Sequence, residues 1–445
     1  MDDRTFSEIK QQAQQLKQSK NFAEALPLFK QLWEEYRENC NEWDGWNYAH
    51  CLTKQKNYKT ALKICREVYE IKQNFEQNNN LYAWCIYYTE IKIDKVTNEQ
   101  LFFKAGEGII KLSKQENKSI KQQTDFPCVY SLSVFKTLDY LNKKAIYNPK
   151  PILYWTEKLN PDFLEATPFK FTDNEGKERE LASKKEDWCF LRSKALYENR
   201  DFADCISLSE MALQSFTKFH YDNDIWFRRN IALSKAELGD IETAIEELKS
   251  LLKRKNEWFI QKEIAELYKK QNKIDEAIKY AVDAALNFGD PDKKMNLYKL
   301  LAELLKAQNK IQEAKPHIEL VYKIRFANQW KIDSELLDLV SFYNIDTNNI
   351  PDEKELLKRL KRIWENLKFG SQEILKGIIK TIISEGRAGF IETENRKSYF
   401  FSTKDFKGRR ELIQQGQKVS FFLADSFDKK KKQPNKVAVN VKPIK

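Results

Sequence analysis

The segments NKIDEA, residues 272–277, and NKIQEA, residues 309–314, decide the fold, because the same short frame recurs along much of the chain. In each, a turn residue and a few polar residues lead into a helical pattern that begins at a small alanine. The frame returns as GDIETA at 239–244, NYKTA at 57–61 and NFAEA at 21–25. Its last alanines are 36 residues apart in the first pair of copies and 33 and then 37 residues apart in the later three. A period of this length predicts stacked helix pairs that bury one continuous core.

The repeated frame resembles the tetratricopeptide repeat, a helix–turn–helix of about 34 residues. Small residues at Ala49, Ala232, Ala265 and Ala302 support the resemblance, because they lie twelve residues before the second alanine of their repeats, where two helices pack closely. Six repeats are predicted, at 6–39, 42–75, 186–219, 225–258, 258–291 and 295–328. The resemblance implies a groove that holds a protein partner, which the sequence does not identify.

Five regions follow from this pattern. Residues 1–75 and 186–328 are predicted to be two blocks of repeats, and residues 76–185 an irregular helical segment that continues the solenoid. Residues 329–370 are predicted to be capping helices and a linker, with an amphipathic helix at 354–367. Residues 371–445 are expected to form a separate, strand-rich domain.

Charge and glycine content separate this last region from the rest. Residues 371–445 carry 17 Lys and Arg against 8 Asp and Glu, a net charge of +9 out of the +11 of the whole chain. Six of the twelve glycines lie between Gly370 and Gly416. A nearly neutral helical body therefore ends in a cationic module, and such a charge distribution favours a polyanionic partner, most simply nucleic acid.

The same region shows strand periodicity. β-Branched and aromatic residues alternate at 378–383, 389–391, 399–401, 417–422 and 437–441, which predicts five short strands. The sequence resembles a cold-shock domain: Gly377, Ile379 and Lys380 match its first strand, Gly389-Phe390-Ile391 its second, and Gln415–Phe421 its fourth. The fold class predicted is therefore mostly α, a tetratricopeptide-type solenoid followed by a small five-stranded OB-fold β-barrel.

The resemblance implies single-stranded RNA or DNA as the ligand, held by stacking on aromatic side chains over a basic face. Thr381, Ile382 and Ala388 replace three aromatic positions of the family, and Ser402 replaces its histidine. We therefore expect salt-dependent, sequence-tolerant binding carried mainly by phosphate contacts. The predicted nucleic-acid-binding residues are Lys380, Arg387, Phe390, Phe400, Ser402, Lys404, Lys429, Lys430, Lys431 and Lys432.

Two interpretations of the module stay open. In the first, the chain is a non-enzymatic adaptor that joins a protein partner to a single strand. In the second, it is a protein-only scaffold, because Phe390 and Phe400 could pack the barrel and a four-lysine loop could be only solvated. The order of a repeat array followed by a cold-shock-like module is similar to proteins of bacterial conflict and antiphage defence loci, which implies a role in antiviral defence.

No catalytic motif accompanies these features. The three histidines, His50, His220 and His317, have no acidic or cysteine partner at ligand spacing, and the sequence holds no phosphate-binding glycine loop. We expect no enzyme activity, cofactor or metal. Seven unpaired cysteines, no signal-like start and no long apolar run predict a cytoplasmic protein that does not enter a membrane.

Overall fold

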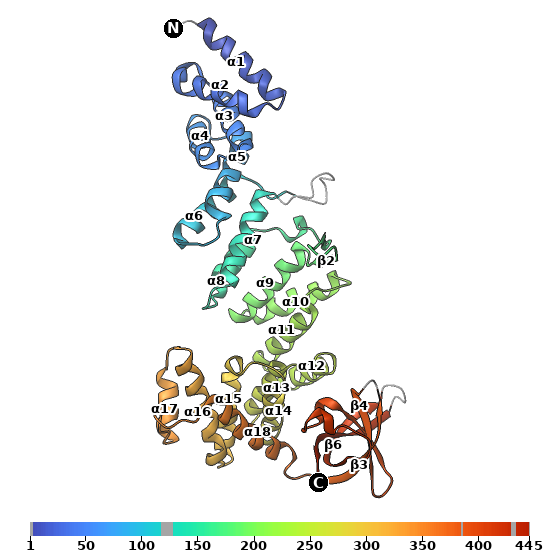
Figure 1. Ribbon diagram of the computed structural model, residues 1–445. Coiled ribbons are helices and arrows are strands. Elements are labelled where there is room, and N and C mark those ends of the chain that lie inside the picture. Colours follow the sequence, from blue (N-terminus) through green and yellow to red (C-terminus); the bar gives the residue numbers. More distant parts are fainter. Residues whose placement is uncertain (1–2, 117–127, 384–385, 429–432, 445) are drawn as a thin grey trace. The chain divides into compact units, whose positions relative to one another are not determined.

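The computed structural model of the chain describes residues 3–116, 128–383, 386–428 and 433–444 (Figure 1). They form two compact units, residues 1–251 and residues 252–445. The first unit is helical apart from one β-hairpin, and the second joins helices to a closed sheet of five strands. This agrees with the predicted fold class at the level of a helical solenoid followed by a small β module.

The first unit consists of consecutive helices joined by short turns. Their bounds are α1 (Asp3–Gln18), α2 (Phe22–Glu35), α3 (Glu42–Lys54), α4 (Tyr58–Ile71), α5 (Glu76–Ile86), α6 (Glu99–Leu112), α7 (Val129–Asn142), α8 (Pro149–Glu157), α9 (Lys184–Glu198), α10 (Phe202–Ser215), α11 (Asn223–Glu237) and α12 (Ile241–Arg254), the last of which ends beyond the unit boundary.

Six turns in the chain share one geometry, and they are the turns that the repeated frame predicts. Each has three residues, the middle one in the left-handed region with φ between 57° and 104°: Lys20, Lys56, Arg200, Gly239, Asn272 and Asn309. The next residue donates its amide to a carbonyl five positions back, as from Asn21 to Leu16 (2.9 Å) and from Lys310 to Leu305 (2.9 Å). This bond satisfies a carbonyl that the end of a helix leaves unpaired.

The alanines of the frame are buried where two helices meet. Ala25, Ala61 and Ala277 are 0% exposed, and so are their partners in the preceding helices, Ala49 and Ala265. A larger side chain at such a position would push the helices apart or force strained rotamers. The spacing of small residues in the sequence therefore reports close helix packing.

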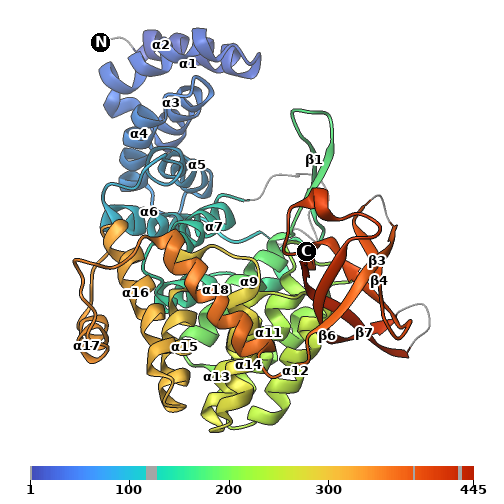
Figure 2. The ribbon, with the colours of Figure 1, turned by 60° about the horizontal axis from the view of Figure 1, so that its bottom comes forward.

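The segment between the two blocks of repeats departs from the period. A π-helical turn at Tyr87–Ile91 follows α5, and a hairpin of β1 (Phe169–Thr172) and β2 (Glu178–Leu181) precedes α9. Figure 2 shows the hairpin extending away from the helices around it. Its strands are almost wholly exposed, and the sequence analysis did not predict it.

The helices of the second unit are α13 (Trp258–Lys270), α14 (Ile274–Leu286), α15 (Met295–Ala307), α16 (Ile311–Ala327), α17 (Ser334–Phe342) and α18 (Glu353–Phe369). Helix α18 covers the segment that the sequence predicted as an amphipathic helix. Its apolar side, Leu356, Leu360 and Trp364, belongs to the same hydrophobic core as α14 to α16.

The five C-terminal strands are β3 (Leu375–Ile383), β4 (Ala388–Thr393), β5 (Ser398–Ser402), β6 (Lys418–Asp428) and β7 (Gln433–Pro443). They close in the order β3-β4-β5-β7-β6, with β6 paired back to β3. Every pairing is antiparallel except β5 with β7. We call this closed sheet the strand ring; its core holds Ile379, Ile391, Phe401, Phe406, Val419, Phe421, Ala438 and Val441.

Candidate functional site

Two aromatic side chains lie side by side on the outer surface of the strand ring. Phe390 of β4 and Phe400 of β5 are direct cross-strand partners, and their rings meet edge to face with centroids 5.7 Å apart. Both are partly exposed, whereas their neighbours Ile391 and Phe401 point into the core. Strand alternation therefore turns Phe390 and Phe400 away from the core that Ile391 and Phe401 fill.

Polar and basic residues gather at one end of this pair of strands. Arg387 and Lys404 are both exposed, and their turns are tied together because the Arg387 carbonyl accepts hydrogen bonds from the Thr403 amide and hydroxyl, each 3.0 Å long. The Ser402 hydroxyl accepts from the Lys404 amide at 3.3 Å and so caps the turn after β5. The structure thus gathers Arg387, Ser402 and Lys404 beside Phe390 and Phe400.

The position of Lys380 is different, because it lies on β3 and forms an ion pair with Glu392 of β4. Its side chain is 57% exposed and borders an open groove of about 530 Å³ along the outer surface of β3. Lys376 and Lys418 also line this groove. Sequence reasoning did not select these two lysines, although residues 376, 378 and 380 share one face of an alternating strand.

The remaining predicted positions of the ring divide into two groups. Of the residues that replace family aromatics, Thr381 lies opposite Phe390, Ile382 packs on the core and Ala388 is buried. The four lysines Lys429, Lys430, Lys431 and Lys432 lie outside the described residues, between the last described pair of β6 and β7, Asp428 and Gln433.

A second site lies on the solenoid, within the first unit. A pocket of about 380 Å³ is bordered by α7, α9 and the beginning of α11, which are the first helices of three consecutive pairs. The side chains of Phe135, Phe190, Tyr221 and Trp226 line it together with Asp139 and Asp187. The sequence predicted a groove in the solenoid but named none of these residues.

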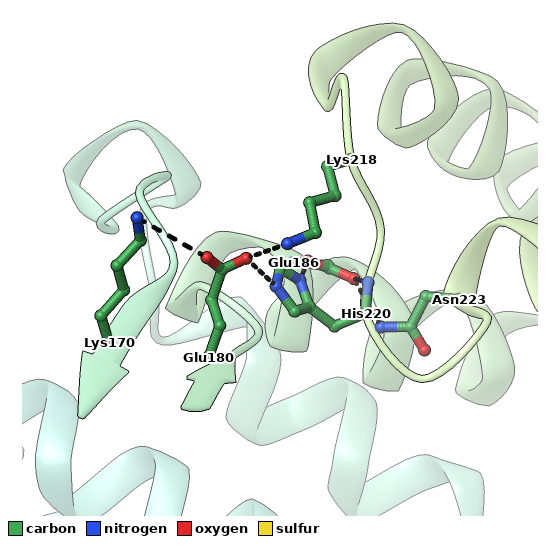
Figure 3. Close-up of polar contacts among 6 residues, drawn as sticks. All are labelled: Lys170, Glu180, Glu186, Lys218, His220 and Asn223. Atoms are coloured by element: carbon green, nitrogen blue, oxygen red, sulfur yellow. Dashed lines mark hydrogen bonds and ion pairs between the residues drawn. The ribbon is translucent and has the colours of Figure 1, made fainter. Parts of the chain in front are cut away.

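A histidine clamp adjoins this pocket (Figure 3). His220 Nδ1 lies 2.8 Å from Glu186 Oε2, and His220 Nε2 lies 2.8 Å from Glu180 Oε1. Glu186 also accepts the His220 amide (2.9 Å) and the Asn223 side-chain amide (2.8 Å), while Glu180 accepts Lys218 Nζ (2.6 Å). The clamp joins strand β2, the start of α9 and the loop before α11.

The charges of the clamp follow from its geometry. A carboxylate only accepts hydrogen bonds, so both ring nitrogens of His220 carry protons and the imidazole is cationic. Burial alone lowers the pKa of His220, but the hydrogen bonds to Glu186 and Glu180 outweigh it and the net shift is upward. Hydrogen bonds from Lys218 and His220 lower the pKa of Glu180 to about 2.

The sequence analysis predicted no acidic partner for His220, and this expectation was wrong. Glu180 and Glu186 come from 40 and 34 residues away, so local spacing could not reveal them. The other two histidines are buried more simply. Burial lowers the pKa of His50 and of His317 to about 4 each, and His317 accepts a hydrogen bond from Trp364 Nε1 at 2.9 Å.

Three further findings hold for the described part of the chain. Within it, no three His, Cys, Asp or Glu side chains come together as a metal site. None of its helices has the length and apolar character needed to span a bilayer. All seven cysteines are free thiols, and burial raises the pKa of Cys51 to about 11 and of Cys189 to about 12.

Comparisons with known proteins give repeat-protein likenesses. A family model described as a domain of unknown function (DUF7017) matches residues 225–362. No curated protein matches the chain. Similar solved structures include a tetratricopeptide repeat protein from Parabacteroides merdae, at 11% identity over 82% of this chain and 100% of that one, with a TM-score of 0.27.

Two others are Pseudomonas aeruginosa PilF and the TPR2AB domain of yeast Sti1 in complex with pHSP90. PilF is 12% identical over 72% of this chain and 97% of its own, with a TM-score of 0.25. The Sti1 domain is 11% identical over 69% of this chain and 96% of its own, with a TM-score of 0.25. These likenesses assign no function. The six equal turns and the buried alanines are those of a helical protein of tetratricopeptide-repeat type.

Proposed function

We propose that the chain is a non-enzymatic adaptor whose solenoid binds a protein partner and whose strand ring binds single-stranded nucleic acid. The observation that carries the second half is the pairing of Phe390 with Phe400 on the outer surface of a ring in a region of net charge +9. Outward aromatic rings offer stacking faces to bases of any sequence, and nearby cations neutralise phosphates.

The topology of the ring supports an OB-fold assignment. Five strands closed in the order β3-β4-β5-β7-β6, with β5 and β7 parallel, form a small Greek-key barrel. In an OB-fold the second and third strands and two flanking loops face the ligand. Here those strands are β4 and β5, which carry Phe390 and Phe400, and one flanking turn carries Arg387.

The experiment is fluorescence anisotropy of the full-length chain with labelled single strands of RNA and DNA across a salt series. The double variant Phe390→Ala/Phe400→Ala should weaken binding by about tenfold or more, since one base stack contributes roughly 1–3 kcal/mol. The matched control is Phe169→Ala/Phe171→Ala, a pair of exposed, stacked rings on the β1–β2 hairpin.

Either of two results would contradict this proposal. Flat titrations at low salt with both strands would show that the ring has no such ligand. Equal losses in the Phe390/Phe400 variant and in the hairpin control would show that the outward pair is not the stacking surface. A preference for RNA over DNA, or its absence, decides which strand is the natural class of ligand.

A protein-only scaffold is the second candidate, and one contact favours it. Phe422, on the outer surface of β6, stacks on Phe369 at the end of α18 with centroids 4.7 Å apart and planes 11° apart. Lys442 of β7 adds an ion pair to Glu365 (3.3 Å). Part of the outer surface of the ring therefore already serves packing. The role in antiviral defence stays a prediction from domain order, to be tested by phage challenge of a host with and without the gene.

A further inference from the structure

The pocket between α7, α9 and α11 has walls of a defined chemical character. Four aromatic side chains, Phe135, Phe190, Tyr221 and Trp226, and two carboxylates, Asp139 and Asp187, line its volume of about 380 Å³. The faces of aromatic rings carry negative electrostatic potential and attract cations. Rings and carboxylates together therefore favour a positively charged guest over a neutral or an acidic one.

One side chain of the protein itself already demonstrates this preference. Lys184 Nζ lies 4.9 Å from the centroid of the Phe135 ring and 3.0 Å from Asp187 Oδ2. An ammonium group is thus accommodated by one ring and one carboxylate at the edge of the pocket. Burial raises the pKa of the Asp187 carboxyl although Lys184 opposes the shift, so this carboxylate is incompletely compensated.

The mouth of the pocket is held in a strained conformation. Tyr221 and Asp222 both have positive φ, 53° and 59°, which two consecutive non-glycine residues rarely adopt. His220 immediately before them and Asn223 immediately after them are both bonded to Glu186 (Figure 3). The clamp fixes both ends of the turn, and the Tyr221 side chain, 62% exposed, stays at the pocket.

We propose that this pocket receives an arginine or lysine side chain from a peptide segment of the protein partner. The guanidinium or ammonium group would lie against the aromatic walls and pair with Asp187, whose exposed pair with Lys184 is weak and easily exchanged. The inference rests on the protein-binding half of the proposed function and is independent of the strand ring.

The test uses the full-length chain and four labelled peptides of one glycine–serine scaffold, in which a central position is Arg, Lys, Glu or Leu. Anisotropy or NMR titration measures each affinity. The Arg and Lys peptides should bind on the order of tenfold more tightly than the Glu and Leu peptides, as a partly desolvated cation–π site with a carboxylate predicts.

Two variants locate the binding. Asp187→Asn removes the carboxylate, and Tyr221→Gly removes the ring at the mouth while keeping a residue that tolerates positive φ. Each should weaken the Arg peptide about fivefold or more. Asp204→Asn, an equal charge change at an exposed position of α10, is the matched control and should leave the affinity unchanged.

The outcomes separate this inference from the proposed function. If the Glu or Leu peptide binds as well as the Arg peptide and loses affinity in Tyr221→Gly, the pocket is a partner site but the basic specificity is wrong. If Asp187→Asn and Asp204→Asn behave alike, the attraction is a general charge effect and the inference is overturned. If no peptide binds, this pocket is not the partner site at all.

Discussion

His220 and Glu186 are joined twice: the His220 amide donates to one carboxylate oxygen at 2.9 Å, and its ring Nδ1 donates to the other at 2.8 Å. Glu186 is 1% exposed, so its charge depends on these donors and on Asn223. A buried carboxylate that loses its cationic partner costs several kcal/mol. The pair therefore links the stability of the first unit to the protonation of one imidazole.

We expect His220→Gln to lower the free energy of unfolding by about 3 kcal/mol at about pH 6. Because the folded state raises the pKa of His220 above its ordinary value near 6.5, the stabilisation is fully present below that pH. It is lost as the pH rises through the folded-state pKa. Urea denaturation at about pH 6 and about pH 9 should show the difference from wild type shrinking with rising pH.

His50→Gln is the matched control for this prediction. Burial lowers the pKa of His50 to about 4, so its ring is neutral across the same range. Its effect on stability should not change between the two pH values. A His220→Gln effect that is equally flat, or that grows with pH, would show that the ring is neutral in the folded protein.

A second prediction concerns the lysines of the strand ring. The variant Lys376→Ala/Lys380→Ala/Lys418→Ala removes three charges around the β3 groove and should reduce the slope of log affinity against log salt for a single strand. The slope falls by about 0.7 for each phosphate that the variant no longer neutralises. Three exposed solenoid lysines, Lys30, Lys59 and Lys63, supply the charge-matched control. An unchanged slope would place the phosphate contacts elsewhere on the protein.

The repeat turns give a third prediction, on stability. Lys56→Gly should raise the free energy of unfolding by about 0.5 kcal/mol, because glycine adopts positive φ without the cost that lysine has there. Gly239→Ala, at the equivalent turn position with φ 104°, should lower it by about 1 kcal/mol. Thermal or urea unfolding measures both.

The control for the turn is Lys63→Gly, in the middle of helix α4 and 77% exposed. Glycine in a helix interior costs about 1 kcal/mol relative to a good helix former. The same substitution should therefore change sign between Lys56 and Lys63. A loss of stability at both positions would mean that the turn at residue 56 is not under strain.

The features that local sequence could predict are those that repeat or alternate. The buried alanines, such as Ala61 and Ala277, recur because close helix packing demands a small side chain once in every repeat. The strands of the ring could be predicted because inward residues such as Ile391 and Phe401 alternate with outward ones. Both are constraints that act between near neighbours in the chain.

The features that were missed depend on distant parts of the chain. The β1–β2 hairpin exposes Phe169 and Phe171 rather than burying them, so it lacks a sign of a core-facing strand. Its attachment to the first unit includes Glu180, which meets His220 across 40 residues. The pocket likewise combines side chains of three helices, and a single sequence contains no local pattern for such a meeting.

The fourth prediction concerns the attachment of α18. His317 is 0% exposed, and its Nδ1 donates to the Glu313 carbonyl at 2.9 Å, so its Nε2 is the acceptor for Trp364 Nε1. Trp364→Phe keeps an aromatic ring but deletes the donor and leaves a buried acceptor unpaired. We expect a loss of about 1–3 kcal/mol in urea unfolding. Trp330→Phe, at a tryptophan that is 44% exposed, is the control and should be close to neutral.

The pH dependence of this contact has the opposite sign to that of the clamp. Burial lowers the pKa of His317 to about 4, so its contribution is fully present above the ordinary histidine pKa near 6.5 and is lost as the pH falls toward 4. The clamp of His220 weakens instead as the pH rises. The second unit should therefore lose stability from His317 on the acid side, and the first unit from His220 on the alkaline side. Acid titration of wild type and His317→Gln, followed by unfolding at each pH, checks this; a wild-type advantage that persists unchanged at about pH 4 would show that His317 is not held neutral.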